Sequence, residues 1–90
     1  MRINFNQLIH DYNQERGKTR GLSPASECLT KADLAREMVQ EGILKSVKSA
    51  LNMIDYHQKG TAKSIDYEML TFLEKKFNKT SGEIITEWQQ

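Results

Sequence analysis

TKADLAREMVQEGILKSVKSALNMIDYHQKG, residues 30–60, predicts two helices joined by a short turn at Glu41 and Gly42. At the start of the first helix, Thr30 can accept a hydrogen bond from a first-turn amide, and Asp33 places negative charge at the positive helix end. The apolar residues of this helix recur at helical spacing: Leu34, Ala35, Met38 and Val39. Gly42 follows them, where a left-handed conformation ends a helix.

The second helix is expected over residues 45–59, and its two sides differ in chemistry. One side is apolar, with Val47, Ala50, Leu51 and Ile54. The other side is polar and basic, with Lys45, Lys48, Ser49, Asn52, Tyr56 and Lys59. Four lysines and one acid, Asp55, lie between positions 45 and 63, although the net charge of the whole chain is only +1. Such a face suits DNA, because lysines neutralise phosphates and short polar side chains reach base edges. An ordinary solvated helix face has the same pattern, and the sequence leaves both interpretations open.

The length and composition predict one small helical domain over residues 1–90. With 38% hydrophobic and 28% charged residues, the chain can form a modest core. No strand-like alternation is long enough to predict a sheet, so the expected class is all-α. No apolar run approaches the ~18 residues that cross a membrane, and no signal-peptide pattern opens the chain. The single Cys28 agrees with a reducing compartment, and we expect a cytoplasmic protein with no membrane partner.

Three further helices are expected outside residues 30–60. Asn4 can cap a first helix that carries Phe5 and Leu8, and a loop follows over residues 17–29. Ser64 or Asp66 can cap a later helix whose apolar side carries Leu70, Leu73 and Phe77 with Met69 beside them. Thr80 and Glu83 have the spacing of a capping box, which opens a last short helix with Ile84, Ile85 and Trp88.

Phe72 lies off the apolar side of its helix, and two interpretations remain open. The last helix covers it, or it marks a surface for self-association. The segment from Ile84 to Trp88 is a second candidate dimer surface, although a single Trp is more often a packing residue.

No constellation in the chain predicts catalysis, a metal site or a bound cofactor. His10 and His57 are far apart and lack neighbouring ligands at metal-binding spacing. His57 lies at the edge of an apolar helix side and is interpreted as a packing residue. Cys28 lacks the surroundings of a nucleophile, and no glycine-rich phosphate loop follows a strand. We therefore expect a non-enzymatic protein without a small-molecule substrate.

The order of several short motifs resembles the Cro and phage-repressor family of helix-turn-helix DNA-binding domains. These motifs are Asp33-Leu34-Ala35, Gln58-Lys59-Gly60, Lys63-Ser64-Ile65, Leu70-x-x-Leu73 and Gly82-Glu83-Ile84-Ile85. The likeness covers nearly the whole chain and is greatest to small single-domain regulators of bacteria and phages. It implies a compact, lambda-repressor-like bundle of about five short helices, with the helix-turn-helix at about 30–60. The chain has about nine more residues than is usual between Leu34-Ala35 and Gly60.

The resemblance implies sequence-specific binding to double-stranded DNA by a repressor-like transcriptional regulator. The helix at 45–59 would read the major groove, with Ser49, Asn52 and Met53 at the base-reading positions. Tyr56 would contact a sugar or phosphate. The phosphate-binding lysines would be Lys45, Lys48, Lys59 and Lys63. Because one such domain contacts few base pairs, a homodimer on two half-sites is favoured.

The alternative is a non-catalytic helical module of the same architecture that binds another protein and has lost DNA affinity. Near-zero net charge supports it, as do the acids close to the predicted DNA-binding elements: Glu27, Asp33, Glu37, Glu41 and Asp55. A continuous positive strip through the four lysines would favour DNA. A mixed surface with exposed Phe72 and Tyr56 would favour a protein partner.

Overall fold

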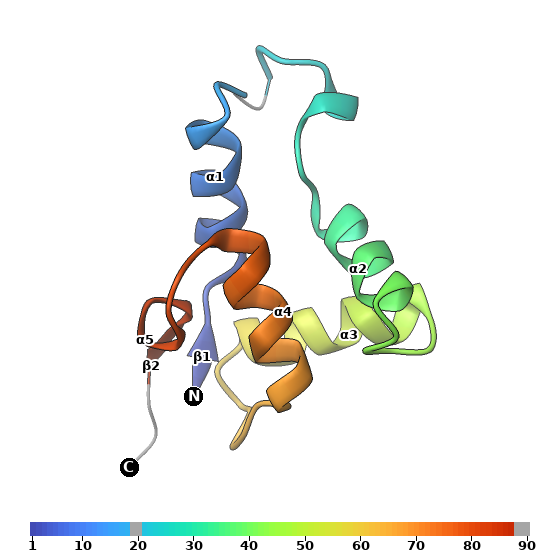
Figure 1. Cartoon of the computed structure of the whole chain (residues 1–90), viewed down its shortest axis with the longest axis vertical. Helices are drawn as coiled ribbons and strands as arrows, with labels where there is room; N and C mark the ends of the chain where they lie inside the picture. Colours follow the sequence, from blue (N-terminus) through green and yellow to red (C-terminus); the bar gives the residue numbers. More distant parts are fainter. Residues whose placement is uncertain (19–20, 88–90) are drawn as a thin grey trace.

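The computed structural model describes residues 1–18 and 21–87 as a mostly helical bundle (Figure 1). The helices are α1 (Phe5–Glu15), α2 (Lys31–Gln40), α3 (Val47–Gln58), α4 (Tyr67–Phe77) and α5 (Ser81–Ile84). A short 3-10 helix, η1 (Ala25–Glu27), lies in the connection between α1 and α2. The expectation of a small helical bundle is confirmed, and the predicted loop at 17–29 contains one turn of 3-10 helix.

The expected all-α class is wrong in one respect, because two short strands form an antiparallel sheet. β1 (Arg2–Ile3) pairs with β2 (Ile85–Glu87), with Ile3 opposite Ile85 and an irregular register toward Arg2. The last helix was expected to contain Ile85 and instead ends at Ile84. Strands of two and three residues are too short to show alternation in the sequence, and their pairing joins opposite ends of the described chain. Trp88 lies outside the described residues.

One hydrophobic core joins all five helices and the sheet. Its buried members are Ile3, Phe5, Leu8, Leu34, Ala35, Met38, Ala50, Ile54, Met69, Leu73, Phe77, Ile84 and Ile85. Each helix contributes its apolar side, as the helical spacing predicts. In α4, Met69 is buried and Leu70 is only half-buried, so the buried side is rotated slightly from the predicted one. Asp66 is the residue that caps α4, where its side chain accepts from the amide of Glu68.

The buried side chain of Asn13 connects the end of α1 to the segment before α2. Its amide oxygen accepts from the backbone N–H of Leu29 at 2.7 Å, and its amide nitrogen donates to the Leu29 carbonyl at 3.1 Å. Because both polar atoms of a buried amide need partners, this pair satisfies Asn13 and holds the long connection at one point. Figure 1 shows this connection arching from α1 to α2.

The N-terminal strand packs against the C-terminal end of α3. The Arg2 side chain donates from Nε to the Gln58 carbonyl at 3.0 Å, and the Met1 nitrogen donates to the Ala62 carbonyl at 2.8 Å. The Gln58 carbonyl belongs to the last turn of α3 and has no partner within the helix, so Arg2 satisfies it. Gly60 has a φ of +80° and lies where an added Cβ would be 3.5 Å from the Cβ of Arg2. A left-handed conformation beside a packed strand accounts for glycine at this position.

Tyr12 of α1 lies at the junction of α1, α2 and α4. Its ring packs edge-on against Phe77 with centroids 5.8 Å apart, and the Lys76 ammonium lies 4.8 Å from the same ring. Lys76 also forms an ion pair with Glu37 of α2 at 2.9 Å. Burial lowers the pKa of Lys76, but hydrogen bonds to Glu37 and Tyr12 outweigh it and leave the pKa above the ordinary value. The cluster therefore ties three helices together with one cation.

No helix in residues 1–18 and 21–87 has both the length and the apolar character required to cross a membrane.

Candidate nucleic-acid interface

The helix that carries most of the predicted DNA contacts is α3, and it is shorter than the expected range of 45–59. Ser46 is its N-cap and Lys59 its C-cap. The Ser46 hydroxyl accepts a hydrogen bond from the Ser49 amide at 3.1 Å, which fixes the helix start after Lys45. Lys45 and Lys59 therefore flank α3 and do not lie within it.

The predicted turn at Glu41 and Gly42 is present, but the connection that joins α2 to α3 is longer than expected and runs from residue 41 to residue 46. Gly42 has a φ of +76° and ends α2 as expected. The chain then continues through Ile43, whose N–H donates to the Met38 carbonyl, and through Leu44. Both apolar side chains are half-buried against the core. The connection is longer because these two residues take part in core packing.

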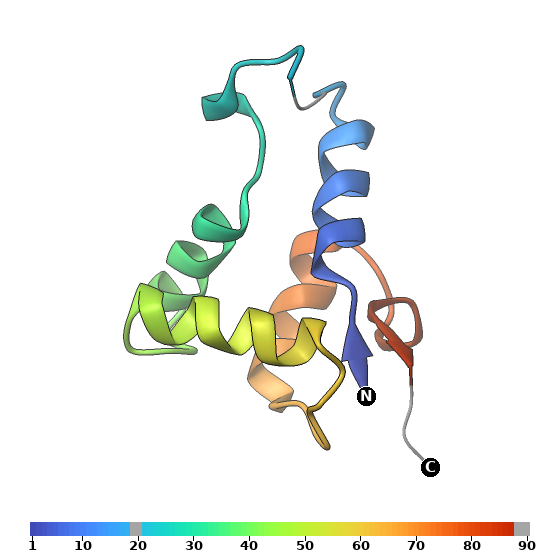
Figure 2. The same cartoon turned by 180° about the vertical axis from the view of Figure 1, so that it is seen from behind.

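The inner side of α3 is fixed by the core. Ala50 and Ile54 are fully buried, and α2 packs against this side of the helix. Figure 2 shows α3 across the front of the molecule, with α4 behind it. A helix held in this way from behind presents its other side at the surface.

Seven of the eight predicted site residues are exposed, and four of these lie on α3 itself. The four are Lys48, Ser49, Asn52 and Tyr56, and the other three are Lys45, Lys59 and Lys63 at or beyond the helix ends. Met53 differs, because it is half-buried and packs against the core. Asp55 is also exposed, seven residues after Lys48 and four before Lys59, so helical periodicity places its carboxylate on the same side as these lysines.

The N-terminal end of α3 is electropositive. Its first turn contains Lys48 and no acidic residue, and Lys45 immediately precedes the cap. The Ser46 hydroxyl also donates to the Ser49 hydroxyl at 3.0 Å, so the capping groups are neutral. The positive partial charge of the helix end is therefore reinforced by lysines and attracts anions.

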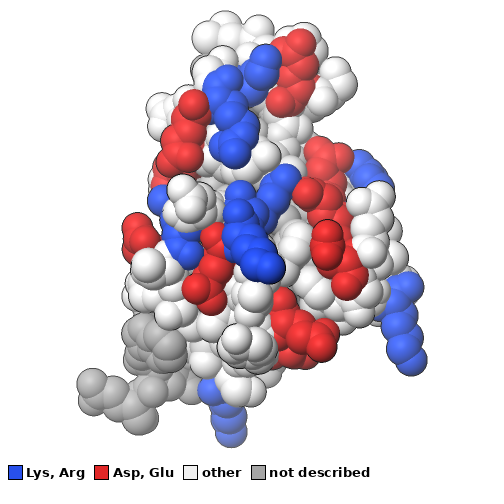
Figure 3. Space-filling view, in the orientation of Figure 1, with Lys and Arg blue, Asp and Glu red and all other residues white. Residues whose placement is uncertain are grey.

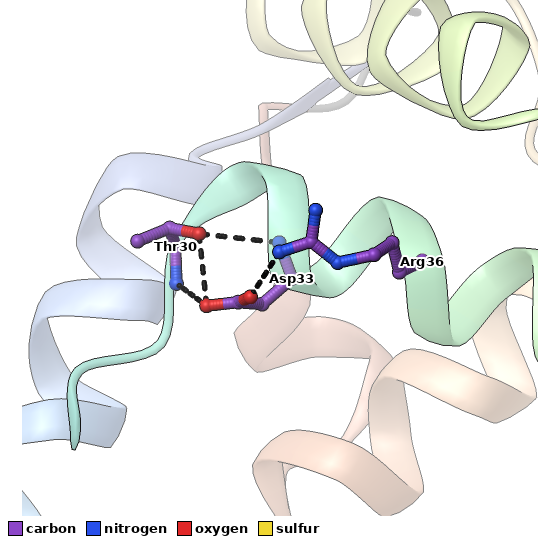
Figure 4. A network of polar contacts seen from close by, with 3 residues as sticks. All are labelled: Thr30, Asp33 and Arg36. Carbon is purple, nitrogen blue, oxygen red and sulfur yellow. Dashed lines mark hydrogen bonds and ion pairs between the residues drawn. The ribbon is translucent and has the colours of Figure 1, made fainter. Parts of the chain in front are cut away.

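Three of the five acids that favoured a protein partner are paired within the chain. Asp33 binds Arg36 at 2.6 Å, Glu37 binds Lys76 at 2.9 Å, and Glu27 binds Lys18 at 3.0 Å. Figure 4 shows the first of these, in which the Asp33 carboxylate also accepts from the amide and hydroxyl of Thr30. The Thr30 hydroxyl, followed by Arg36, lowers the pKa of Asp33. Glu41 and Asp55 are the two acids of this set that remain exposed without a described ion pair.

The face of the molecule that carries α4 is electrostatically mixed. Figure 3 shows acidic and basic side chains interspersed on this face, with no continuous basic area. The α4 face therefore lacks the electrostatic character of a phosphate-binding surface.

The expectation that His57 is a packing residue is confirmed, since only 2% of its surface is exposed. Its Nδ1 atom is buried without a hydrogen-bond partner. Burial lowers the pKa of His57, which favours the neutral imidazole. In the part of the chain that the structure describes, no group of three or more His, Cys, Asp or Glu side chains is arranged to hold a metal ion.

Sequence reasoning missed two groups that position α3, Arg2 and Gln58. Gln58 accepts from the Asn6 amide at 3.2 Å through its side-chain oxygen, and its carbonyl accepts from Arg2. Nothing in the local pattern marks these contacts, because the partners are more than fifty residues apart.

Comparisons of this chain with protein-family models, with curated proteins and with solved structures found no match.

Proposed function

We propose that this chain binds double-stranded DNA in a sequence-specific manner, as a transcriptional regulator, and that α3 enters the major groove. The observation that carries the proposal is the exposed side of α3. It presents Lys48, Ser49, Asn52 and Tyr56 from one helix whose opposite side is buried against α2 and the core. A rigid helix with basic and hydrogen-bonding groups on its free side suits groove binding.

The exposed residues divide into two roles. Lys45 and Lys48 near one end of α3, and Lys59 and Lys63 near the other, would contact phosphates. The helix has 12 residues and is therefore about 18 Å long, which exceeds the major-groove width of about 12 Å. Lysines at the two ends would accordingly reach the backbones on both sides of the groove.

Sequence reading would rest on Ser49 and Asn52, which lie one turn apart in the first half of α3. An Asn side chain can pair with the N6 and N7 atoms of adenine, and a Ser hydroxyl can pair with several bases. Tyr56 follows one turn later, where its hydroxyl would meet the sugar-phosphate backbone. The partly buried Met53 would add at most apolar contact with a thymine methyl.

The internal ion pairs support DNA over a protein partner. Asp33, Glu37 and Glu27 are compensated by cations of the same chain, so they repel phosphate less than free carboxylates would. Asp55 is the acid that opposes the proposal most directly, because it lies on the exposed side of α3. The Asp55 carboxylate would repel phosphate and lower the affinity for DNA, but the four lysines would outweigh this repulsion.

Selection from a random pool of labelled duplexes tests the proposal, with binding measured at two salt concentrations. The test variant carries Lys48→Glu and Asn52→Ala. Its matched control carries Lys79→Glu and Gln14→Ala. The first reverses a charge just after α4 and the second removes a side-chain amide on α1, so both changes match the test variant but lie outside α3. We expect an enriched motif that the test variant loses and the control keeps. Loss of the phosphate contact at Lys48 reduces the slope of log affinity against log salt by about 1.

Two outcomes would contradict the proposal. The first is no binding by the wild-type chain even at low salt, which would favour the protein-binding alternative. The second is binding that the test variant and the control reduce equally, because α3 would then not be the element that contacts DNA.

A further inference from the structure

A groove of about 560 Å³ lies between α4 and the end of α2, and no residue of α3 lines it. Ile43 and Phe72 contribute apolar surface to it, and Tyr67, Glu68 and Lys75 line its α4 side. Phe72 is half-buried against the core, and its exposed part lines the groove. Phe72 is therefore not fully buried, and the interpretation of a self-association surface stays open.

The α4 side of the groove carries exposed aromatic and charged side chains. Tyr67 is 79% exposed, so most of its side chain is open to solvent beside the groove. Glu68 and Lys75 are exposed, and within residues 1–18 and 21–87 neither is in a described ion pair. The neighbouring Lys76 is already paired with Glu37.

These residues have a symmetric order along α4. Glu68, Phe72 and Lys75 follow the i, i+4, i+7 spacing that places side chains on one side of a helix. The point midway between residues 68 and 75 falls between Thr71 and Phe72. The acid and the base therefore lie at equal distances on either side of this point, each about 5 Å along the helix axis at 1.5 Å per residue.

We propose that α4 packs antiparallel against α4 of a second copy of this chain, about a two-fold axis that passes between Thr71 and Phe72. In that arrangement Glu68 of each copy lies level with Lys75 of the other, which forms two identical ion pairs. The two Phe72 side chains meet near the axis. Such an isologous contact uses one patch twice, and the patch must be complementary to itself.

Charge complementarity favours a second copy of the chain as the occupant of the groove, and it favours antiparallel over parallel packing. A parallel pair would place Glu68 beside Glu68 and Lys75 beside Lys75, and both contacts would be repulsive. A uniformly charged foreign segment would be attracted at one end of the groove and repelled at the other. Glu41, which also lines the groove, gives the partner's Lys75 a second acceptor.

The apolar contact supplies most of the stability, and the ion pairs set the register. Exposed ion pairs contribute little to affinity, whereas like charges forced together are costly. The proposal does not rest on DNA binding, because its residues lie on α4 and α2 and not on the exposed side of α3.

Charge reversal with four forms of the full chain tests the proposal: wild type, Glu68→Lys, Lys75→Glu, and both changes together. We expect wild type to be a dimer by sedimentation over a range of protein concentrations. Each single variant places like charges together twice in the dimer, and its dissociation constant rises about tenfold, equivalent to about 1.4 kcal/mol. The double variant restores opposite charges and the wild-type dissociation constant.

Mixing the two single variants is the sharpest measurement. The Glu68→Lys chain is basic at both positions and the Lys75→Glu chain is acidic at both, so antiparallel packing predicts a 1:1 heterodimer. Native mass spectrometry of the mixture detects it when one of the two chains is labelled with ¹⁵N, because the unlabelled chains have nearly equal masses. Glu15→Lys on α1 reverses an exposed charge outside the groove and should leave the dimer unchanged. Circular dichroism of every form establishes that the surface changes leave the helices folded.

Three results would overturn the proposal. Wild type that sediments as a monomer at every concentration would exclude the second copy as occupant of the groove. A dimer that neither single variant weakens would place the contact elsewhere. Single variants that weaken the dimer but form no heterodimer on mixing would exclude the antiparallel register.

Discussion

The N-terminal ends of α2 and α3 begin with the same hydrogen bond and differ in charge. The Thr30 hydroxyl accepts from the Asp33 amide at 3.1 Å, and the Ser46 hydroxyl accepts from the Ser49 amide at 3.1 Å. In α2 the third residue is an acid whose carboxylate completes a capping box and binds Arg36 (Figure 4). In α3 the third residue is a neutral serine and the preceding one is Lys48. The hydrogen bond of the N-cap is thus common to both helix starts, whereas an acid that compensates the positive helix end is present only in α2.

The other helices differ in whether their first turn contains an acidic residue. The first turns of α4 and α5 contain Glu68 and Glu83, as that of α2 contains Asp33. In α5 the Thr80 amide donates to the Glu83 carboxylate and lowers the pKa of Glu83. The first turn of α1 lacks an acid but also lacks a lysine. Among the described α-helices, α3 combines an uncompensated start with added positive charge, which lowers its stability and raises its affinity for anions.

The largest expected effect comes from a substitution that gives the N-terminal end of α3 the acidic third residue that α2 has. Ser49→Glu creates the Ser-x-x-Glu spacing of a capping box after Ser46. We expect DNA affinity to fall about tenfold or more, because a carboxylate then faces the phosphates, while the free energy of unfolding rises by about 0.5 kcal/mol. Fluorescence anisotropy with the selected duplex and urea unfolding measure the two quantities.

Ser49→Ala is the control for this prediction, since it removes the hydroxyl without adding charge. It should cost less affinity than the glutamate and give no gain in stability. A Ser49→Glu chain that binds DNA as tightly as wild type would show that the electropositive start of α3 has no part in binding.

The next effect separates the two caps by their dependence on salt. Asp33→Ala in α2 and Ser46→Ala in α3 should each lower the free energy of unfolding by about 1 kcal/mol. Added salt should reduce the cost of Asp33→Ala, because part of it is the charge interaction with Arg36 and the helix end. The cost of Ser46→Ala should not change. Urea unfolding at low and high salt measures both, and equal salt dependence would refute the distinction.

A smaller effect is expected from pH. The pKa of Asp33 is lowered in the folded protein, so its stabilising contribution is complete above the unfolded value of about 3.9 and is lost as the pH falls through the folded value. The Thr30 amide, which donates to this carboxylate, should shift in NMR spectra over that range. The Ser49 amide, bound to a hydroxyl that does not titrate, should not follow the same step. Coincident titration of both amides would contradict the assignment.

The smallest expected effect is a gain of affinity. Asp55→Asn removes the one acid from the exposed side of α3 and should strengthen DNA binding by about threefold at low salt, with little difference at high salt. Glu15→Gln on α1 removes an acid elsewhere and serves as the control in the same anisotropy titration. An equal gain from both would attribute the effect to net charge and not to the position of Asp55.

The features that sequence reasoning predicted correctly are those made by residues close together in the chain. The caps at Asn4 and Thr30, the capping-box spacing of Thr80 and Glu83, and the left-handed end at Gly42 all form within a few residues. The apolar sides of the helices follow from helical periodicity in the same way. Site residues on α3 were found at the surface for this reason, because burial of one helix side leaves the other exposed.

Local reasoning failed where a distant segment decided the conformation. The connection from residue 41 to residue 46 is longer than predicted because Ile43 and Leu44 pack against the core, and no short-range pattern specifies that packing. Met53 was predicted at a base-reading position from its place along α3, and the structure shows that its side chain is half-buried and packs against the core. The strand pair β1–β2 was missed because each strand gains its hydrogen bonds only from the other.

The sequence by itself determined where each helix starts, which of its sides is apolar and which helix start lacks an acid, since these depend on interactions within about one helical turn. Tertiary structure alone decided the pairing of β1 with β2 and the hydrogen bonds between Asn13 and Leu29. It also decided that Phe72 and Tyr67 share a groove with Glu68 and Lys75. These features require segments far apart in the chain to meet, and their position is set by the packing of the whole core.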